Sequence, residues 1–247
     1  MRILLSNDDG INSAGLKALH DALKDEHDVV VVAPDRERSA VSHSLTLHRP
    51  LRVREITRGW FSVDGTPTDC VHLALNGLLA DPRPELVVAG INMGGNLGDD
   101  ITYSGTVAAA IEGMLLGLPS AAVSLVSQGP FEFGPAAEFA AWLVRKVESQ
   151  GLPEDTLLNV NVPDLPSDRI RGLQITRQGK STYGEAIVEK VDPRGQTYFW
   201  VGSGNPEWVR RGDTDLDAVH EGRISVTPLH LNMTNEKAYQ EMLKWSS

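Results

Sequence analysis

The sequence predicts an α/β fold, specifically a Rossmann-like three-layer sandwich with a mostly parallel sheet, followed by a C-terminal segment rich in β-hairpins. Short apolar runs such as residues 28–33 carry β-branched residues on both faces, which is typical of parallel strands buried between helices. Helical patterns separate these runs as far as Pro163, where the alternation stops. We therefore expect a Rossmann-like core at residues 1–163 and a β-rich arm with a final helix at residues 164–247.

The core elements follow from local signals. Residues 2–6 form an apolar first strand, and Ser13 is a suitable cap for a helix over about 14–24. Thr66 and Pro67 mark the start of a helix that reaches about Leu79, because proline suits the first helical position. Further strands or extended pieces are expected at residues 28–33, 45–56, 60–64, 85–91, 120–126 and 157–162, and further helices at 105–117 and 135–149.

The chain beyond Pro163 reads as short strands with a final helix. Strands are expected at residues 170–178, 183–191, 196–202 and 222–227, and a helix at 234–245. Residues 192–195 carry the sequence Asp-Pro-Arg-Gly, which is a good hairpin turn. Trp200 and Trp208 lie in this region. A hairpin that carries aromatic side chains is too small to bury its own faces. It either docks on a partner subunit or packs on the first part of the chain.

Composition narrows the classes of function. The formal net charge of −10 argues against binding of a nucleic-acid polymer, which requires a basic stripe. No run of about 18 apolar residues indicates a membrane span, and no secretion signal is visible. Cys70 is the only cysteine, so we expect a thiol buried in the core and a reducing, cytoplasmic location.

Two adjacent carboxylates, Asp8 and Asp9, follow the first strand directly. They repel each other unless a cation lies between them, which suggests a divalent metal; helix capping with one solvated acid is the alternative. Ser39 and Asn92 follow the strands at 28–33 and 85–91, and loops at the carboxyl ends of parallel strands share one edge of the sheet. This set of hard oxygen donors suits Mg²⁺ or Mn²⁺.

A glycine-rich loop and a helix start supply a second feature. Glycines in residues 90–98 allow backbone N–H groups to approach a ligand closely. Ser104, Gly105 and Thr106 open the next helix, where free N–H groups and the helix dipole favour a phosphate. Plain capping of that helix by Ser104 is the alternative.

Other nucleotide and hydrolase classes lack their motifs here. The sequence contains no Gly-x4-Gly-Lys-[Ser/Thr], no Gly-x-Gly-x-x-Gly after the first strand and no Gly-x-Ser-x-Gly. These absences disfavour a P-loop NTPase, a dinucleotide dehydrogenase and an α/β hydrolase respectively.

Three runs, at residues 5–10, 33–39 and 90–106, resemble the motifs of the SurE family, the stationary-phase survival-protein nucleotidases. The resemblance implies a divalent-metal-dependent phosphatase acting on nucleoside 5′- and 3′-monophosphates. Some bacterial members also hydrolyse short-chain polyphosphate. It further implies a cytoplasmic homodimer or homotetramer that exchanges C-terminal segments, with one metal ion per subunit. By position, the metal ligands are Asp8, Asp9, Ser39 and Asn92, and the phosphate site is Asn96, Ser104, Gly105 and Thr106.

For the mechanism we expect direct attack of water on phosphorus, with Asp9 orienting or deprotonating that water. A covalent route with Asp8 as nucleophile is the alternative, although the contiguous acids lack the usual Asp-x-Asp spacing. Either His43 or water would protonate the leaving oxygen. A nucleotide-binding oligomeric regulator without turnover and a sugar-nucleotide transferase are the alternatives to a phosphatase.

Overall fold

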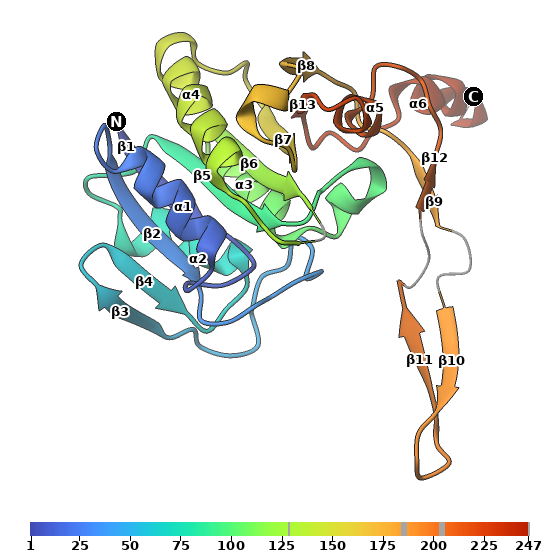
Figure 1. Ribbon diagram of the computed structural model, residues 1–247, viewed down its shortest axis with the longest axis horizontal. Helices are drawn as coiled ribbons and strands as arrows, with labels where there is room; N and C mark the ends of the chain where they lie inside the picture. Colours follow the sequence, from blue (N-terminus) through green and yellow to red (C-terminus); the bar gives the residue numbers. More distant parts are fainter. Residues whose placement is uncertain (128, 184–186, 203–205, 247) are drawn as a thin grey trace.

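The fold is a nine-stranded sheet covered by helices on both faces (Figure 1). The computed structural model describes residues 1–127, 129–183, 187–202 and 206–246. Its sheet has the order β3-β4-β2-β1-β5-β6-β7-β13-β8. The central parallel strands are β2 (Asp28–Pro34), β1 (Arg2–Ser6), β5 (Leu86–Met93), β6 (Ser120–Val126) and β7 (Leu157–Pro163). The predicted mostly parallel α/β sheet is confirmed.

Helices form the two outer layers. α1 (Ala14–Leu23) and α4 (Gly134–Gln150) share one apolar cluster with one face of the sheet, and α2 (Pro67–Leu73) and α3 (Gly105–Leu115) share another with the opposite face. Ser13 and Thr66 cap α1 and α2 as predicted, each accepting a backbone N–H of the first turn. Cys70 is buried in the second cluster, as expected for a core thiol.

The sheet ends in mixed strands on both sides. β4 (Trp60–Val63) runs parallel to β2, and β3 (Val53–Thr57) pairs antiparallel with β4. At the other edge, β13 (Ile224–Leu229) pairs antiparallel with β7, and β8 (Leu173–Ile175) runs parallel to β13. Both β13 and β8 come from the chain beyond Pro163, so that segment contributes directly to the main sheet.

Several boundaries differ from the sequence prediction. Residues 45–52 form no strand, because the Thr46 and Arg52 N–H groups donate to the carboxylates of Asp69 and Asp64 and hold this stretch as a loop. α2 ends at Leu73 and passes into a π-helical turn, Ala74–Leu78. The extended stretch predicted at 170–178 is reduced to β8. A short helix not predicted from the sequence, α5 (Asp215–His220), precedes β13. The final helix α6 spans Glu236–Met242 and passes into a 3-10 turn at Leu243–Ser246.

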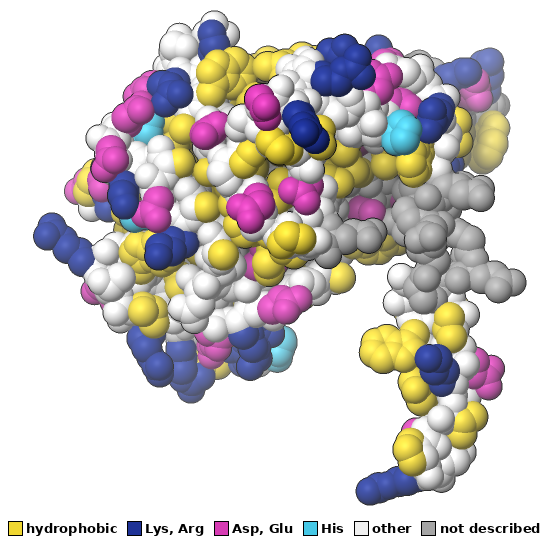
Figure 2. Space-filling model, in the orientation of Figure 1, with side chains coloured by type: hydrophobic (Ala, Val, Ile, Leu, Met, Phe, Trp, Pro, Cys, Tyr) yellow, Lys and Arg dark blue, Asp and Glu magenta, His cyan; other side chains and the backbone are white. Residues whose placement is uncertain are grey.

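The C-terminal segment carries a projecting hairpin (Figure 1). β10 (Ile187–Val191) pairs antiparallel with β11 (Thr197–Val201), and the Asp192 carboxylate accepts the N–H groups of Arg194 and Gln196 in the turn, as the Asp-Pro-Arg-Gly signal predicted. At its base β9 (Ser181–Tyr183) pairs with β12 (Pro206–Trp208). Apolar side chains line the hairpin in Figure 2, and Trp200 is 60% exposed. The hairpin therefore does not pack on the first part of the chain.

No helix in the described part of the chain has both the length and the apolar character needed to cross a membrane.

Candidate metal and phosphate site

The loops after β1, β2 and β5 meet at one edge of the sheet and surround a cavity of about 330 Å³. The cavity contains all four predicted metal ligands and two of the predicted phosphate residues. Its lining residues are Asp8, Asp9, Glu37, Ser39, Ala40, Asn92, Met93, Gly94, Gly95, Asn96, Asp100, Tyr103 and Ser104. The rule that loops converge at the carboxyl edge of a parallel sheet therefore correctly predicted that these residues lie together.

A tight turn after β1 presents the two acids. The Asn7 side chain accepts the Gly10 N–H at 3.2 Å and donates to the Gly10 carbonyl at 3.1 Å and the Ser13 hydroxyl at 2.7 Å. Gly10 has φ +96°, and a Cβ there would lie 2.9 Å from the Arg36 backbone. Glycine is therefore required for the chain to turn back and leave Asp8 and Asp9 facing the cavity.

Asp8 is held from the start of α3. The Thr106 hydroxyl donates to Asp8 Oδ1, and a Cβ on Gly105 would lie 2.7 Å from Asp8 Cβ. Gly105 and Thr106 are buried and stand behind Asp8, outside the lining of the cavity. In this structure both residues lie against the Asp8 side chain and fix its position.

The surroundings of Asp8 and Asp9 disfavour the ionised form of both side chains. Burial raises the pKa of Asp8 above its ordinary value. Burial and the neighbouring charge of Asp8 raise the pKa of Asp9 to about 6, although the Met93 N–H donates to Asp9 Oδ2 at 3.2 Å. A bound cation would remove this cost, because an opposite charge favours the ionised form.

Ser39 and Asn92 present the remaining oxygen donors. Asn92 donates its Nδ2 to the Gly94 carbonyl at 2.8 Å, and its Oδ1 lies 3.5 Å from Thr106 Oγ1. The Ser39 hydroxyl donates to Glu37 Oε1 at 2.7 Å. Glu37 was not predicted from the sequence; its place two residues before Ser39 in the same loop is the signal that could have indicated it.

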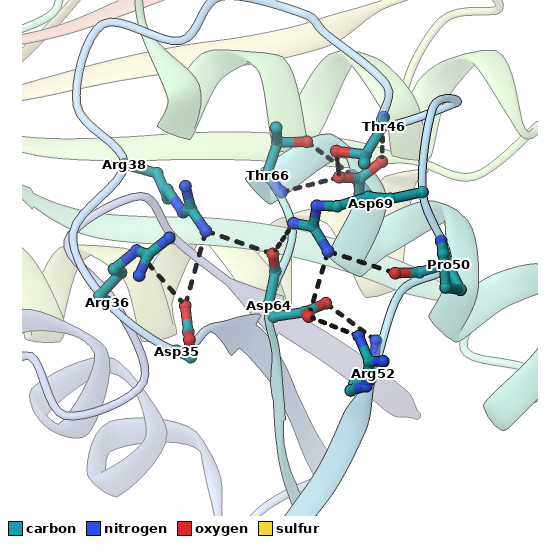
Figure 3. Close-up of polar contacts among 10 residues, drawn as sticks. Asp35, Arg36, Arg38, Thr46, Pro50, Arg52, Asp64, Thr66 and Asp69 are labelled. Carbon is teal, nitrogen blue, oxygen red and sulfur yellow. Dashed lines mark hydrogen bonds and ion pairs between the residues drawn. The ribbon is translucent and has the colours of Figure 1, made fainter.

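A network of arginines fixes the loop that carries Ser39 (Figure 3). Arg38 Nη2 donates to the Asp64 carbonyl at 3.2 Å, and Arg49 also donates to that carbonyl. The Asp64 carboxylate lies 3.1 Å from Arg49 Nη1 and accepts the Arg52 N–H at 2.8 Å. Asp64 precedes α2, so the network joins the Ser39 loop to the entry of that helix.

A second anchor of the same loop is Asp69 on α2. Its carboxylate accepts the Thr46 N–H at 2.8 Å and the Thr46 hydroxyl at 2.6 Å, as Figure 3 shows. The same side chain accepts the Thr66 N–H at 2.8 Å in the capping box of α2. One carboxylate therefore both starts the helix and holds the loop.

His43 is tied to α3 and does not line the cavity, which weakens its proposed role as the acid for the leaving oxygen. Its Nε2 lies 2.8 Å from Glu112 Oε2, and the other oxygen of Glu112 lies 2.7 Å from His72 Nδ1. Glu112 is buried in the middle of α3, and burial raises the pKa of its carboxyl while the two histidines outweigh that effect and lower it overall. His43 thus anchors the Ser39 loop.

Asn96, on the side of the cavity where the sequence predicts phosphate, is held by two neighbouring strands. Its N–H donates to Asn161 Oδ1 at 2.8 Å, its carbonyl accepts from Asn159 and Asn161 on β7, and its Nδ2 donates to Ser124 on β6 at 2.8 Å. Ser104 accepts the Val107 N–H at 3.0 Å, so it caps α3, as the capping alternative predicted. The same residue also lines the cavity.

The donor set fits a hard divalent cation. The four residues offer carboxylate, amide and hydroxyl oxygens, the ligands that Mg²⁺ and Mn²⁺ prefer. The described residues contain no group of three or more His, Cys, Asp and Glu side chains placed to hold a metal. A cation here would therefore depend on the two acids, on Ser39 and Asn92, and on water, which Mg²⁺ commonly retains.

Comparisons with known proteins identify the family of this chain. The family model described as "Survival protein SurE" matches residues 3–185. A protein called 5′-nucleotidase SurE from Geobacter sulfurreducens is 56% identical over 246 residues, covering 99% of this chain and 94% of its own. One of the same name from Syntrophotalea carbinolica is 54% identical over 248 residues, covering 100% and 98%. The crystal structure of SurE from Aquifex aeolicus superposes with a TM-score of 0.90 at 46% identity and covers both chains completely. The chain belongs to the SurE family.

Proposed function

We propose that this protein is a metal-dependent phosphomonoester hydrolase that releases phosphate from nucleoside 5′- and 3′-monophosphates. The observation that carries the proposal is the pair of adjacent acids, the buried Asp8 and the half-buried Asp9. They line a cavity together with a glycine-rich loop and with Ser104 at the start of α3. The relatives described above bear the name 5′-nucleotidase, which supports the same class of substrate.

In this proposal Asp8, Asp9, Ser39 and Asn92 hold one Mg²⁺ or Mn²⁺ per subunit. When bound, such an ion neutralises charge that develops on the transferring phosphoryl group. Asn96, Ser104 and the N-terminal end of α3 face the phosphate oxygens, where preorganised N–H groups stabilise negative charge. Gly105 and Thr106 contribute by fixing Asp8.

Asp9 is suited to orient the attacking water or to accept its proton. Its carboxylate lines the cavity, and the Met93 N–H fixes one of its oxygens from the backbone. Attack by Asp8 on phosphorus is the rival route. The Asp8 oxygen held by Thr106 is already engaged, which favours attack by water. Trapping of a phosphoenzyme in acid-quenched single turnovers would establish the rival.

We also propose that residues 164–247 provide the oligomerisation arm of a homodimer or homotetramer. The hairpin exposes Ile187, Phe199 and Val201 at 63%, 58% and 80%. Exposed apolar side chains of this kind are typical of surfaces that bind a partner. Light scattering of the wild type and of a Phe199→Ser, Val201→Ser variant tests this: the variant should shift toward monomer.

A nucleotide and metal panel tests the activity. Purified protein is treated with EDTA, reloaded with Mg²⁺ or Mn²⁺, and assayed for phosphate release from 5′- and 3′-nucleotides and from short-chain polyphosphate. We expect release only with metal, and loss of release in Asp9→Asn. Tight nucleotide binding without any release would instead indicate a regulatory binding protein, and full turnover by Asp9→Asn would contradict the proposed site.

A further inference from the structure

Two side chains of the C-terminal segment form hydrogen bonds with the backbone of Gly98 in the glycine-rich loop of the site. The Gly98 N–H donates to Asp215 Oδ2 at 2.8 Å, and its carbonyl accepts from Gln178 Nε2 at 3.0 Å. Gly98 begins the 3-10 helix Gly98–Thr102, which leads directly to Tyr103 and Ser104 at the cavity. Both backbone groups of this residue are therefore held by side chains that lie more than 75 residues away in sequence.

The second oxygen of Asp215 holds the base of the arm. Oδ1 accepts the Gly179 N–H at 2.8 Å and the Leu216 N–H at 2.8 Å. Gly179 lies just before β9, where the chain leaves the body toward the hairpin. A Cβ on Gly179 would come 2.6 Å from Asp215 Oδ1, so the backbone can approach the carboxylate only as glycine.

The local helix accounts for only one of the hydrogen bonds of this carboxylate, the one from the Leu216 N–H. Thr214 caps α5, and Asp217 completes the capping box by accepting back from Thr214. Asp215 is fully buried; one of its oxygens accepts from Gly98 in the glycine-rich loop, and the other accepts from Gly179 at the base of the arm. A buried carboxylate requires hydrogen-bond donors, and the N–H groups that donate to Asp215 are held in place by these bonds.

We propose that Asp215 is a positioning residue for the phosphate side of the site and links the glycine-rich loop to the base of the arm. At residue 96 the loop is fixed to the sheet by Asn159 and Asn161, and at residue 98 it is fixed by Asp215 and Gln178. Displacing the arm base moves the carboxylate, and the carboxylate moves Gly98. The effect on catalysis rests on the proposed phosphatase function; the effect on the loop does not.

The test compares Asp215→Asn with Asp217→Asn, both in α5. An amide has one acceptor oxygen, so Asn at 215 must place an NH₂ group against a backbone N–H and release one of the two segments. Asp217 accepts from Arg211, Gly212 and Thr214 and has no bond to the loop, which makes it the matched control. The readouts are amide hydrogen exchange across residues 94–104, the KM for AMP and the Ki for inorganic phosphate.

Asp215→Asn should speed exchange in the loop and raise KM and Ki about tenfold, because small misplacements of binding groups weaken their contacts strongly. Asp217→Asn should lower the melting temperature while leaving all three readouts near wild type. If Asp215→Asn does not fold, Gln178→Leu removes the other bond to Gly98 and should shift the same readouts in the same direction by about threefold, since one neutral hydrogen bond is lost.

Wild-type exchange in a folded Asp215→Asn protein, or in Gln178→Leu when only that variant folds, would overturn the proposal. So would equal changes in Asp217→Asn. If the wild type releases no phosphate, the proposed function fails, and hydrogen exchange still decides whether Asp215 holds the loop.

Discussion

Replacement of Gly105 by alanine tests whether the position of Asp8 controls activity. An added Cβ would lie 2.7 Å from Asp8 Cβ and 2.9 Å from Asp8 Oδ2, whereas ordinary contacts begin at 3.4 Å. The carboxylate must therefore move by about 0.5 to 0.7 Å to reach ordinary contact. Metal–ligand distances tolerate only about 0.2 Å, so the shift disrupts the proposed metal geometry.

We expect Gly105→Ala to lower kcat/KM about 100-fold, which corresponds to roughly 2.7 kcal/mol of lost transition-state stabilisation. Overpacking costs about 1–3 kcal/mol, and alanine restricts the unfolded chain, which stabilises the fold by about 0.4–1 kcal/mol. The net loss of folding stability should therefore lie between about 0 and 2.6 kcal/mol. Phosphate release with saturating Mn²⁺ and urea unfolding measure the two effects.

Gly134→Ala is the matched control. Gly134 is the first residue of α4 as Gly105 is of α3, but a Cβ there meets nothing within 4 Å. This variant should keep wild-type kcat/KM and gain about 0.5 kcal/mol of stability. Wild-type kcat/KM in Gly105→Ala, or an equal loss in Gly134→Ala, would refute the reasoning.

Four further predictions concern the same site. Thr106→Val removes the hydroxyl that donates to Asp8 while keeping the side-chain shape, so kcat/KM should fall about tenfold or more, and Thr106→Ser should restore it; equal activity of the two variants would contradict a role for the hydroxyl. The pKa of Asp9 is about 6 against an ordinary 3.8, so below pH 6 a binding metal ion must displace a proton from this carboxyl. Calorimetry should therefore show that metal affinity falls about tenfold for each pH unit below about pH 6 and is constant above it. For the same reason, ionisation of Asp9 destabilises the metal-free protein increasingly as the pH rises from about 4 to 6. Asp9→Asn should therefore raise the melting temperature of the metal-free protein at about pH 7.5. No rise would argue against burial as the cause of the raised pKa. His43→Leu leaves one oxygen of buried Glu112 without its partner, so urea unfolding should show a loss of about 1–3 kcal/mol and Mn²⁺ should bind more weakly through the loosened Ser39 loop; unchanged metal affinity would mean that the pair only stabilises the fold.

The order of apolar runs and polar loops was enough to predict the fold class and to bring Asp8, Asp9, Ser39 and Asn92 together. The physical reason is that a buried parallel strand is marked by its own composition, and the carboxyl ends of such strands must share one edge of the sheet. Ser104 as a helix cap and the turn at 192–195 were also readable, because each depends on residues a few positions apart.

Only the tertiary structure decided which distant groups meet. Local patterns could not show that the Thr106 hydroxyl turns toward Asp8, that His43 turns toward Glu112, or that Asp215 reaches across to Gly98. Nor could they place β8 and β13 in the main sheet. These contacts depend on how the helices and the C-terminal segment close over the sheet, and closure is set by packing between segments far apart in sequence, which no local periodicity encodes.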